Sequence, residues 1–107
     1  MFKLKDVKLN KGATLDKQGN ELHYASGYQV SAKDLEIIPA YRLTKKHLIE
    51  MLDKLPKGTN LGVWIDNGKA YIDQSARFLS KNFALKLGRK LNQISIWDWK
   101  ASEAITC

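Results

Sequence analysis

The sequence contains little cysteine, little proline and no long hydrophobic run, and each shortage excludes a class of protein. The single cysteine, Cys107, is the last residue, so no disulfide can form within the chain and we expect a reducing, cytoplasmic compartment. Only two prolines are present, and we find no repeat, linker or low-complexity segment. No apolar run approaches the roughly 20 residues that a membrane span requires, and no signal-peptide pattern opens the chain. We therefore expect no membrane partner.

Catalytic and metal-binding motifs are also missing. The chain has no phosphate-binding glycine-rich loop, nucleophile elbow or HExxH motif. His23 and His47 have no cysteine or carboxylate at the spacing of zinc ligands. Asp66, Asp73 and Asp98 are the remaining candidates for acid–base chemistry or metal binding, but their spacing does not exceed chance. We expect no enzymatic activity, no metal and no cofactor.

Positive charge is the unusual bulk property of the chain, which carries a net charge of +7. Such a surface attracts nucleic acid, acidic protein or anionic lipid. Only Arg42, Arg77 and Arg89 are arginines among the 18 cations, although arginine makes most bidentate contacts to bases and phosphates. The lysine-rich surface is therefore more typical of solubility than of sequence-specific nucleic-acid recognition.

The clearest local structure lies in residues 61–75, within the single domain that we expect over residues 1–107. Asn67-Gly68 is the strongest short hairpin signal, because a type I′ turn requires positive φ at both central positions. This turn places Trp64 opposite Tyr71 as a cross-strand aromatic pair. Alternation then assigns one apolar face to the core: Leu61, Val63, Ile65, Ala70 and Ile72.

Two amphipathic helices are predicted on either side of this hairpin. The first begins after the cap Thr44 and ends before Pro56. Its apolar stripe consists of Leu48, Met51, Leu52 and Leu55. The second spans residues 81–91 after the cap Ser80, and Gly88 within it suggests close approach of a neighbouring element. Its stripe consists of Phe83, Ala84, Leu87 and Leu91.

The remaining segments are predicted to be mainly extended. In chain order they are a basic edge strand or arm (1–11), a second hairpin (13–25), a strand (28–31), a strand or helical turn (32–43), a strand with Ile94 and Ile96 on one face (93–100), and a tail or short strand (101–107). Strands 69–75 and 93–99 would form a βαβ crossover with the second helix if they run parallel.

These elements predict an α+β fold. We expect a small mixed or antiparallel sheet of about four to six strands, with two helices packed on one face in the order ββ-α-ββ-α-β. The alternation places four aromatic residues on the non-core side, namely Trp64, Tyr71, Trp97 and Trp99. They would form a stacking platform for unpaired bases, or they would be buried by the N-terminal hairpin or a partner subunit.

Lysine and arginine side chains complete the predicted contact surface. The second helix has a basic face made of Lys81, Lys86, Arg89 and Lys90, and Lys69 joins the aromatics on the hairpin. A basic helix face is often only solvated, but it can also contact phosphates.

The second half of the chain resembles a set of small proteins from bacteriophages and other mobile elements. Their pattern is Gly-x-Trp-x-Asp-x-Gly-x-x-Tyr-x-Asp-x-Ser, then a helix, then Asn-Gln-x-x-Ile-Trp-Asp. The residues that carry the resemblance, within 61–98, are Gly62, Trp64, Asp66, Gly68, Tyr71, Asp73, Ser75, Asn92, Gln93, Ile96, Trp97 and Asp98. It implies a source in a phage or mobile element, so we expect an accessory protein in the cytoplasm of the bacterial host. That this protein is non-enzymatic is expected from the missing catalytic motifs.

The resemblance also implies the kind of partner. Small phage accessory proteins often bind host machinery or defence complexes, as anti-CRISPR proteins do, so we expect a host protein or ribonucleoprotein complex as partner. The alternative is a direct nucleic-acid-binding protein that uses the basic helix and the aromatic strand face. Monomer and homodimer both remain open.

Overall fold

Six antiparallel strands form one curled sheet in the computed structural model, which describes all 107 residues. The order across the sheet is β1-β3-β4-β2-β5-β6. The strands are β1 (Gly12–Leu15), β2 (Tyr28–Pro39), β3 (Asn60–Asp66), β4 (Lys69–Phe78), β5 (Ser95–Asp98) and β6 (Glu103–Thr106). The helices are α1 (Leu4–Leu9), α2 (Lys45–Asp53) and α3 (Lys81–Lys90), with a 3-10 turn, η1, at Ala40–Arg42. The predicted α+β fold is confirmed.

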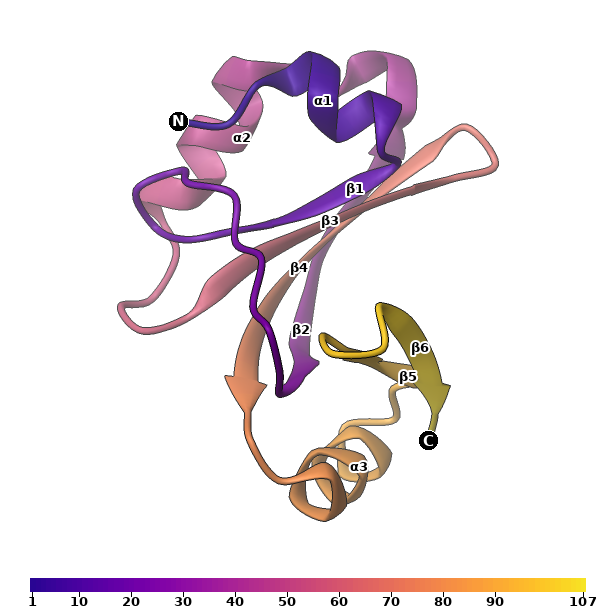
Figure 1. The fold of residues 1–107 in the computed structure, drawn as a ribbon. Coiled ribbons are helices and arrows are strands. Elements are labelled where there is room, and N and C mark those ends of the chain that lie inside the picture. The colour runs from indigo at the N-terminus through magenta and orange to yellow at the C-terminus, as the bar shows by residue number, and fades with distance from the viewer.

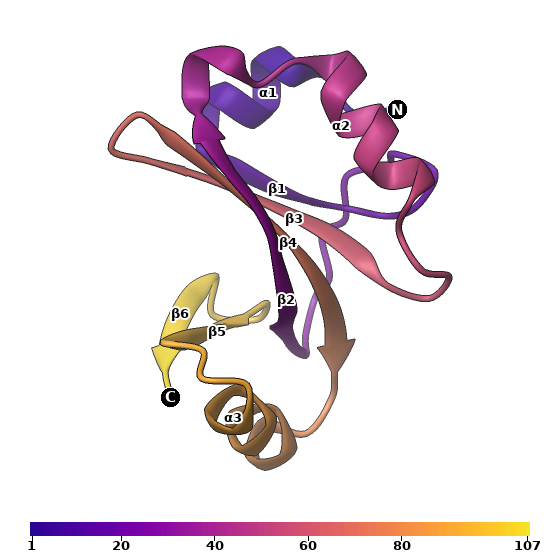
Figure 2. The same ribbon diagram turned by 180° about the vertical axis from the view of Figure 1, so that it is seen from behind.

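The helices gather at the two ends of this sheet. α1 and α2 lie side by side at one end, and α3 lies at the other, near the β5–β6 hairpin (Figure 1). Figure 2 shows the same arrangement from behind, with the long strands β2 and β4 joining the two ends. No helix is long and apolar enough to cross a lipid bilayer.

The β3–β4 hairpin has the register that its turn predicts. Asn67 and Gly68 have φ values of 49° and 74°, the positive angles that a type I′ turn requires. Trp64 pairs with Tyr71, and the rest of the hairpin follows without irregularity. Of the five residues assigned to the core face, four are buried and Ile65 packs against the core.

β2 is the longest strand, and two β-bulges interrupt its pairing with β4. The register slips at Ala32 and again at Leu35, so neither residue has a partner on β4. A bulge bends its strand and increases the local twist, which contributes to the curl of the sheet. Residues 32–43, for which a strand and a helical turn were both open, are strand as far as Pro39 and then form η1.

α2 and α3 begin at the predicted caps. Thr44 Oγ1 accepts a hydrogen bond from the N–H of His47 at 3.1 Å, and Ser80 Oγ accepts one from the N–H of Phe83 at 3.2 Å. These bonds satisfy first-turn N–H groups that have no partner within the helix.

The connection through α3 meets the condition for a βαβ crossover. β4 and β5 are both antiparallel to β2, so they run parallel to each other, although β2 lies between them. Gly88 allows α3 to approach β5 closely, because a Cβ there would lie 3.1 Å from Ile96 Cγ2 and 2.7 Å from Cys107 Sγ. The close approach expected at Gly88 is confirmed.

All three helices pack on the same side of the sheet. Ala70 and Ile72 of β4 belong to the larger core cluster, which also contains residues of α1 and α2. Phe78 of the same strand packs against the smaller cluster, formed by Val30, Ala84 and Ile96 beneath α3. Ala70, Ile72 and Phe78 are separated by even numbers of residues, so they project from one face of β4. The prediction of two helices on one sheet face is therefore confirmed.

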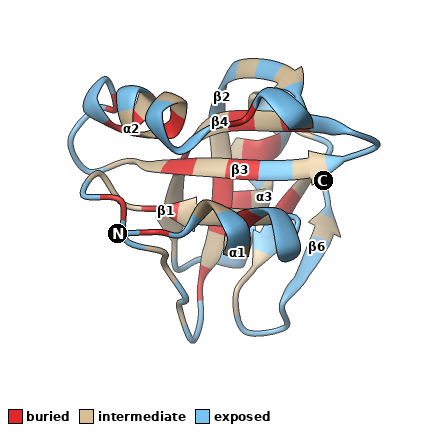
Figure 3. Ribbon diagram, turned by 90° about the horizontal axis from the view of Figure 1, so that it is seen from above, coloured by how far each residue is buried: buried red, intermediate tan, exposed pale blue.

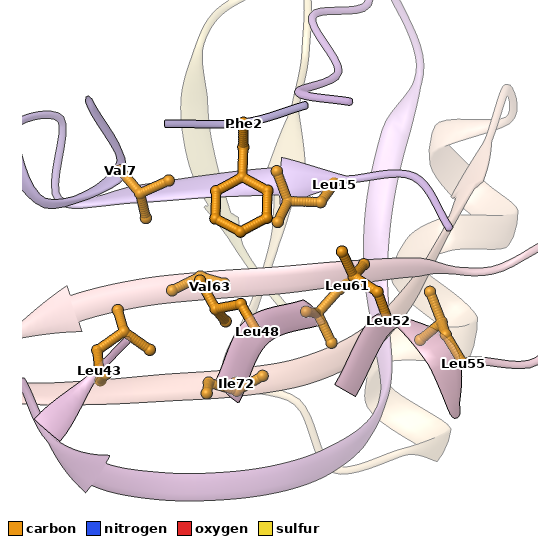
Figure 4. Packing of buried hydrophobic residues seen from close by; sticks show 11 residues of the cluster. Phe2, Val7, Leu15, Leu43, Leu48, Leu52, Leu55, Leu61, Val63 and Ile72 are labelled. Carbon is orange, nitrogen blue, oxygen red and sulfur yellow. The ribbon is translucent and has the colours of Figure 1, made fainter. Parts of the chain in front are cut away.

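The larger cluster lies between α1, α2 and the strands β1, β3 and β4. Phe2, Leu15 and Leu61 are among the side chains that point into this space (Figure 4). Figure 3 shows buried residues along the strands and on the inner sides of the helices, and exposed residues on the outer sides.

Two predictions for the N-terminal part of the chain were wrong. Residues 4–9 form α1 instead of an edge strand or arm, because Leu4 and Val7, one helical turn apart, both face the core. The hairpin expected over residues 13–25 is reduced to β1 and a single bridge between Leu15 and Glu21. The C-terminal segment, which was open between tail and strand, forms β6.

Two apolar residues assigned to the core are exposed. Phe83 is 52% exposed, because α3 turns Ala84 and Gly88 toward the sheet instead. Ile94 is 85% exposed, because it precedes β5 and does not share the inward side of Ile96.

Candidate interaction surface

The face of the sheet opposite the helices, which we call the open face, carries most of the polar and aromatic strand residues. Side chains paired across neighbouring strands lie on the same face, so the pairing groups them into rows. Counted from the β3–β4 turn, the rows are Trp64, Tyr71 and Ile37; Gly62, Asp73 and Asp34; Asn60, Ser75 and Ser31; and Arg77, Gln29 and Trp97.

The row nearest the turn is apolar and accessible to solvent. It contains Trp64 of β3, Tyr71 of β4 and Ile37 of β2, and we call it the aromatic row. Trp64 and Ile37 are each 60% exposed, and Tyr71 is half-buried. Lys69, also exposed, lies at the start of β4 on the same face, opposite Asp66. Large apolar groups placed together in water are typical of an interaction surface.

The next row brings two carboxylates together. Asp73 of β4 pairs directly with Asp34 of β2, an arrangement that is unfavourable for like charges. Burial raises the pKa of Asp73 from 3.8 to about 6, and the Asp34 carboxylate adds to the rise. Gly62, the partner of Asp73 on β3, makes room for this side chain, because a Cβ at position 62 would collide with Asp73 Oδ1.

The two rows farther from the turn form a buried hydrogen-bond network. Gln29 Nε2 donates to Ser75 Oγ and to Asn60 Oδ1, each at 2.9 Å. Gln29 Oε1 accepts from Trp99 Nε1 at 3.1 Å. Gln29 and Ser75 are both buried, so these bonds satisfy polar groups that have little access to water. We infer that Trp99 is mainly structural.

Aromatic residues close this far end of the open face. The Trp99 ring meets Tyr24 edge-on at 5.5 Å and Trp97 at 6.4 Å between centroids. Arg77 lies over the Tyr24 ring at 4.2 Å, and its Nε donates to the Ser26 carbonyl at 2.9 Å. Trp97 remains 39% exposed at the edge of this group. The four predicted aromatics therefore share one face, but in two groups: an accessible pair near the turn and a partly buried pair at the other end.

The basic residues of α3 lie on the other side of the sheet. Lys81, Lys86, Arg89 and Lys90 are all exposed, and none forms an ion pair with a carboxylate. Arg89 Nε donates to the carbonyl of Cys107 at 3.0 Å. Because α3 packs against the helix side of the sheet, its basic face and the aromatic row do not form one continuous surface.

The predicted acidic and histidine candidates do not assemble into a site. Asp66 lies beside the hairpin turn, and Asp98 Oδ1 accepts from the N–H of Ala101 at 3.2 Å. His47 Nε2 lies 2.8 Å from Glu36, and the chain contains no group of three or more His, Cys, Asp or Glu side chains that could hold a metal.

Sequence patterns did not identify Asp34 and Ile37 as members of the open face. Both lie in the segment for which strand and helical turn were both open, and the bulges at Ala32 and Leu35 break the alternation that would have assigned their faces. Their pairing with Asp73 and Tyr71 is visible only once β2 is placed beside β4.

Asp73→Asn should remove a stability loss that develops as the pH rises. The folded carboxyl holds its proton up to about pH 6, and the unfolded one loses it near 3.8. The folded state therefore binds more protons between these values, and the free energy of unfolding falls as pH increases through them. The difference corresponds to at most about 3 kcal/mol at neutral pH.

Urea denaturation at a series of pH values checks this prediction. The stability gain of Asp73→Asn over the unmodified protein should grow between about pH 4 and pH 6 and then level off. Asp53→Asn, at an exposed position on α2, is the matched control and should show no such step. A stability difference that is independent of pH would contradict the assigned environment of Asp73.

No protein-family model, curated protein or solved structure matches the chain significantly.

Proposed function

We propose that the chain is a non-enzymatic accessory protein that docks on a host protein or ribonucleoprotein complex through the open face. The observation that carries the proposal is the aromatic row, in which Trp64 and Ile37, each 60% exposed, lie on opposite sides of Tyr71. Aromatic anchors of this kind supply much of the binding energy at protein interfaces.

The charges around the aromatic row favour a protein partner over nucleic acid at this face. Asp66, Asp73 and Asp34 lie in the adjacent rows, and Lys69 is the one cation among them. A nucleic-acid strand stacked on Trp64 would bring its negatively charged phosphates close to these carboxylates. The two sets of negative charges would repel each other. The open face thus carries local negative charge on a protein whose net charge is +7.

The proposed setting follows from the resemblance to small proteins of phages and mobile elements over residues 61–98. It supports a source in such an element, action in the cytoplasm of the bacterial host, and a role in inhibiting host defence of the anti-CRISPR kind. A compact protein that presents a small apolar patch suits such a role, because it can occupy a surface that the host complex needs for another contact.

Truncating one side chain of the aromatic row should weaken docking and leave the fold intact. Trp64→Ala and Ile37→Ser should each reduce recovery of the partner about tenfold or more, because truncation of an aromatic anchor commonly costs 2 kcal/mol or more. Affinity capture from a lysate of the bacterial host, quantified by mass spectrometry with and without nuclease, measures the recovery.

The matched control is Ile94→Ser, which changes another exposed isoleucine outside the open face. It should retain every partner that the unmodified protein captures. Equal recovery with Trp64→Ala, Ile37→Ser and the unmodified protein would contradict the proposed docking face.

Direct nucleic-acid binding is the second candidate, and α3 provides the observation that favours it. Its four cations are exposed and lack carboxylate partners, so phosphate groups could approach them without competition. A ribonucleoprotein partner would offer phosphates to α3 and a protein surface to the open face.

A salt titration tests this second candidate. Four phosphate contacts predict a slope of about −3.6 for log K against log salt with double-stranded DNA, and the double variant Lys86→Ala/Lys90→Ala should reduce it to about −1.8. The pair Lys54→Ala/Lys57→Ala, with the same charge change outside α3, should leave the slope unchanged. No affinity for single- or double-stranded oligonucleotides at low salt would exclude direct binding.

A further inference from the structure

The paired carboxylates Asp34 and Asp73 form no ion pair with a lysine or arginine of the protein. Both ion pairs in the structure involve histidine, and neither includes these two residues. Lys69 and Arg77, the cations of β4 on the open face, each lie four residues from Asp73, a distance of about 13 Å along a strand. Arg77 is also held by the Ser26 carbonyl and the Tyr24 ring.

A third polar group, the Ser31 hydroxyl, lies beside this pair. Ser31 Oγ, in the adjacent row on β2, is buried and forms no hydrogen bond of good geometry. It lies close enough to Asp73 to offset part of the rise in the pKa of that carboxyl. The polar groups gathered here are therefore two carboxylates and one hydroxyl, and none of them carries a positive charge.

The aromatic row borders the same carboxylates. Tyr71 is two residues from Asp73 on the same face of β4, and Ile37 stands beside it on β2. Side chains at this spacing are about 7 Å apart, so one planar group can contact the carboxylates and lie against the ring at once.

We propose that the open face receives an arginine side chain of the partner protein, whose guanidinium lies between Asp34 and Asp73 and stacks against the aromatic row. The proposal rests on the proposed docking function and specifies its partner chemistry. The guanidinium would supply the missing positive charge and several N–H donors.

Arginine fits these features better than lysine does. Its planar group can donate to two carboxylates together and stack on an aromatic face, and it is desolvated more easily than an ammonium group. The local charges also explain why a strongly basic protein can accept a cation at this face, since Asp34, Asp66 and Asp73 outnumber Lys69.

An arginine peptide provides a direct test. The probe is the blocked pentapeptide Gly-Gly-Arg-Gly-Gly, and the controls carry lysine or the uncharged isostere citrulline at the central position. Titration by amide NMR near neutral pH should shift the signals of Asp34, Tyr71 and Asp73, with arginine binding most tightly and citrulline most weakly.

Single substitutions locate the effect. Asp34→Asn and Asp73→Asn should each weaken binding of the arginine peptide about threefold to fivefold and leave the citrulline peptide unaffected. Asp53→Asn makes the same change of charge on α2 and should leave all three peptides unaffected. Arginine shifts that are absent, spread over the surface, or equal to those of citrulline would overturn the proposal.

The result also separates this inference from the docking function. If Trp64→Ala abolishes capture of the host partner but the arginine peptide does not shift the open face, docking stands and the arginine inference is overturned. If the peptide shifts the open face but capture is unaffected by Trp64→Ala, the docking function fails and the acid pair is supported only as a guanidinium site.

Discussion

The pairing of β4 with its two neighbours is the constraint on which the rest of the structure depends. The Asn67-Gly68 turn sets the register of β4 against β3, and the unbroken alternation along β4 then assigns every second residue to the helix side. Both hydrophobic clusters are built on that side. A slip of one residue would move Ile72 into solvent and the Asp73 carboxylate into the core, so hydrophobic burial holds the register strongly.

The same register creates the energetic conflict on the open face. Asp73 is placed against Asp34 in a partly buried setting. Neither carboxylate forms an ion pair with a lysine or arginine, although the chain contains 18 of these residues. Sequences that fold well usually give a buried carboxylate a partner of opposite charge or a hydrogen-bond donor. Exceptions to such local rules concentrate at functional sites. The aromatic row beside the pair adds exposed apolar surface. The carboxylates without an ion pair and the exposed apolar row together favour a partner surface that is basic and partly apolar.

Much of the fold was predictable because its signals are local. The Asn67-Gly68 turn and the Ser80 cap each determine a boundary through nearby backbone geometry, and Trp64 and Tyr71 follow from the turn. α1 was missed because a helix of six residues carries too few apolar positions to separate its period from that of a strand. Ile37 was missed because two bulges in β2 break the alternation, and their positions depend on the neighbouring strand. The placement of α3 and the aromatic row on opposite sides of the sheet likewise depends on tertiary packing.

The central claim is that the register of β3, β4 and β2 places Trp64, Tyr71 and Ile37 in one exposed row. NMR measurement of side-chain NOEs, combined with relaxation by a soluble paramagnetic agent, tests this claim most directly. The account predicts NOEs from the Tyr71 ring to both Trp64 and Ile37, strong relaxation of Trp64 and Ile37, and protection of Ile72. Absence of a contact between Tyr71 and Ile37, or strong relaxation of Ile72, would contradict it.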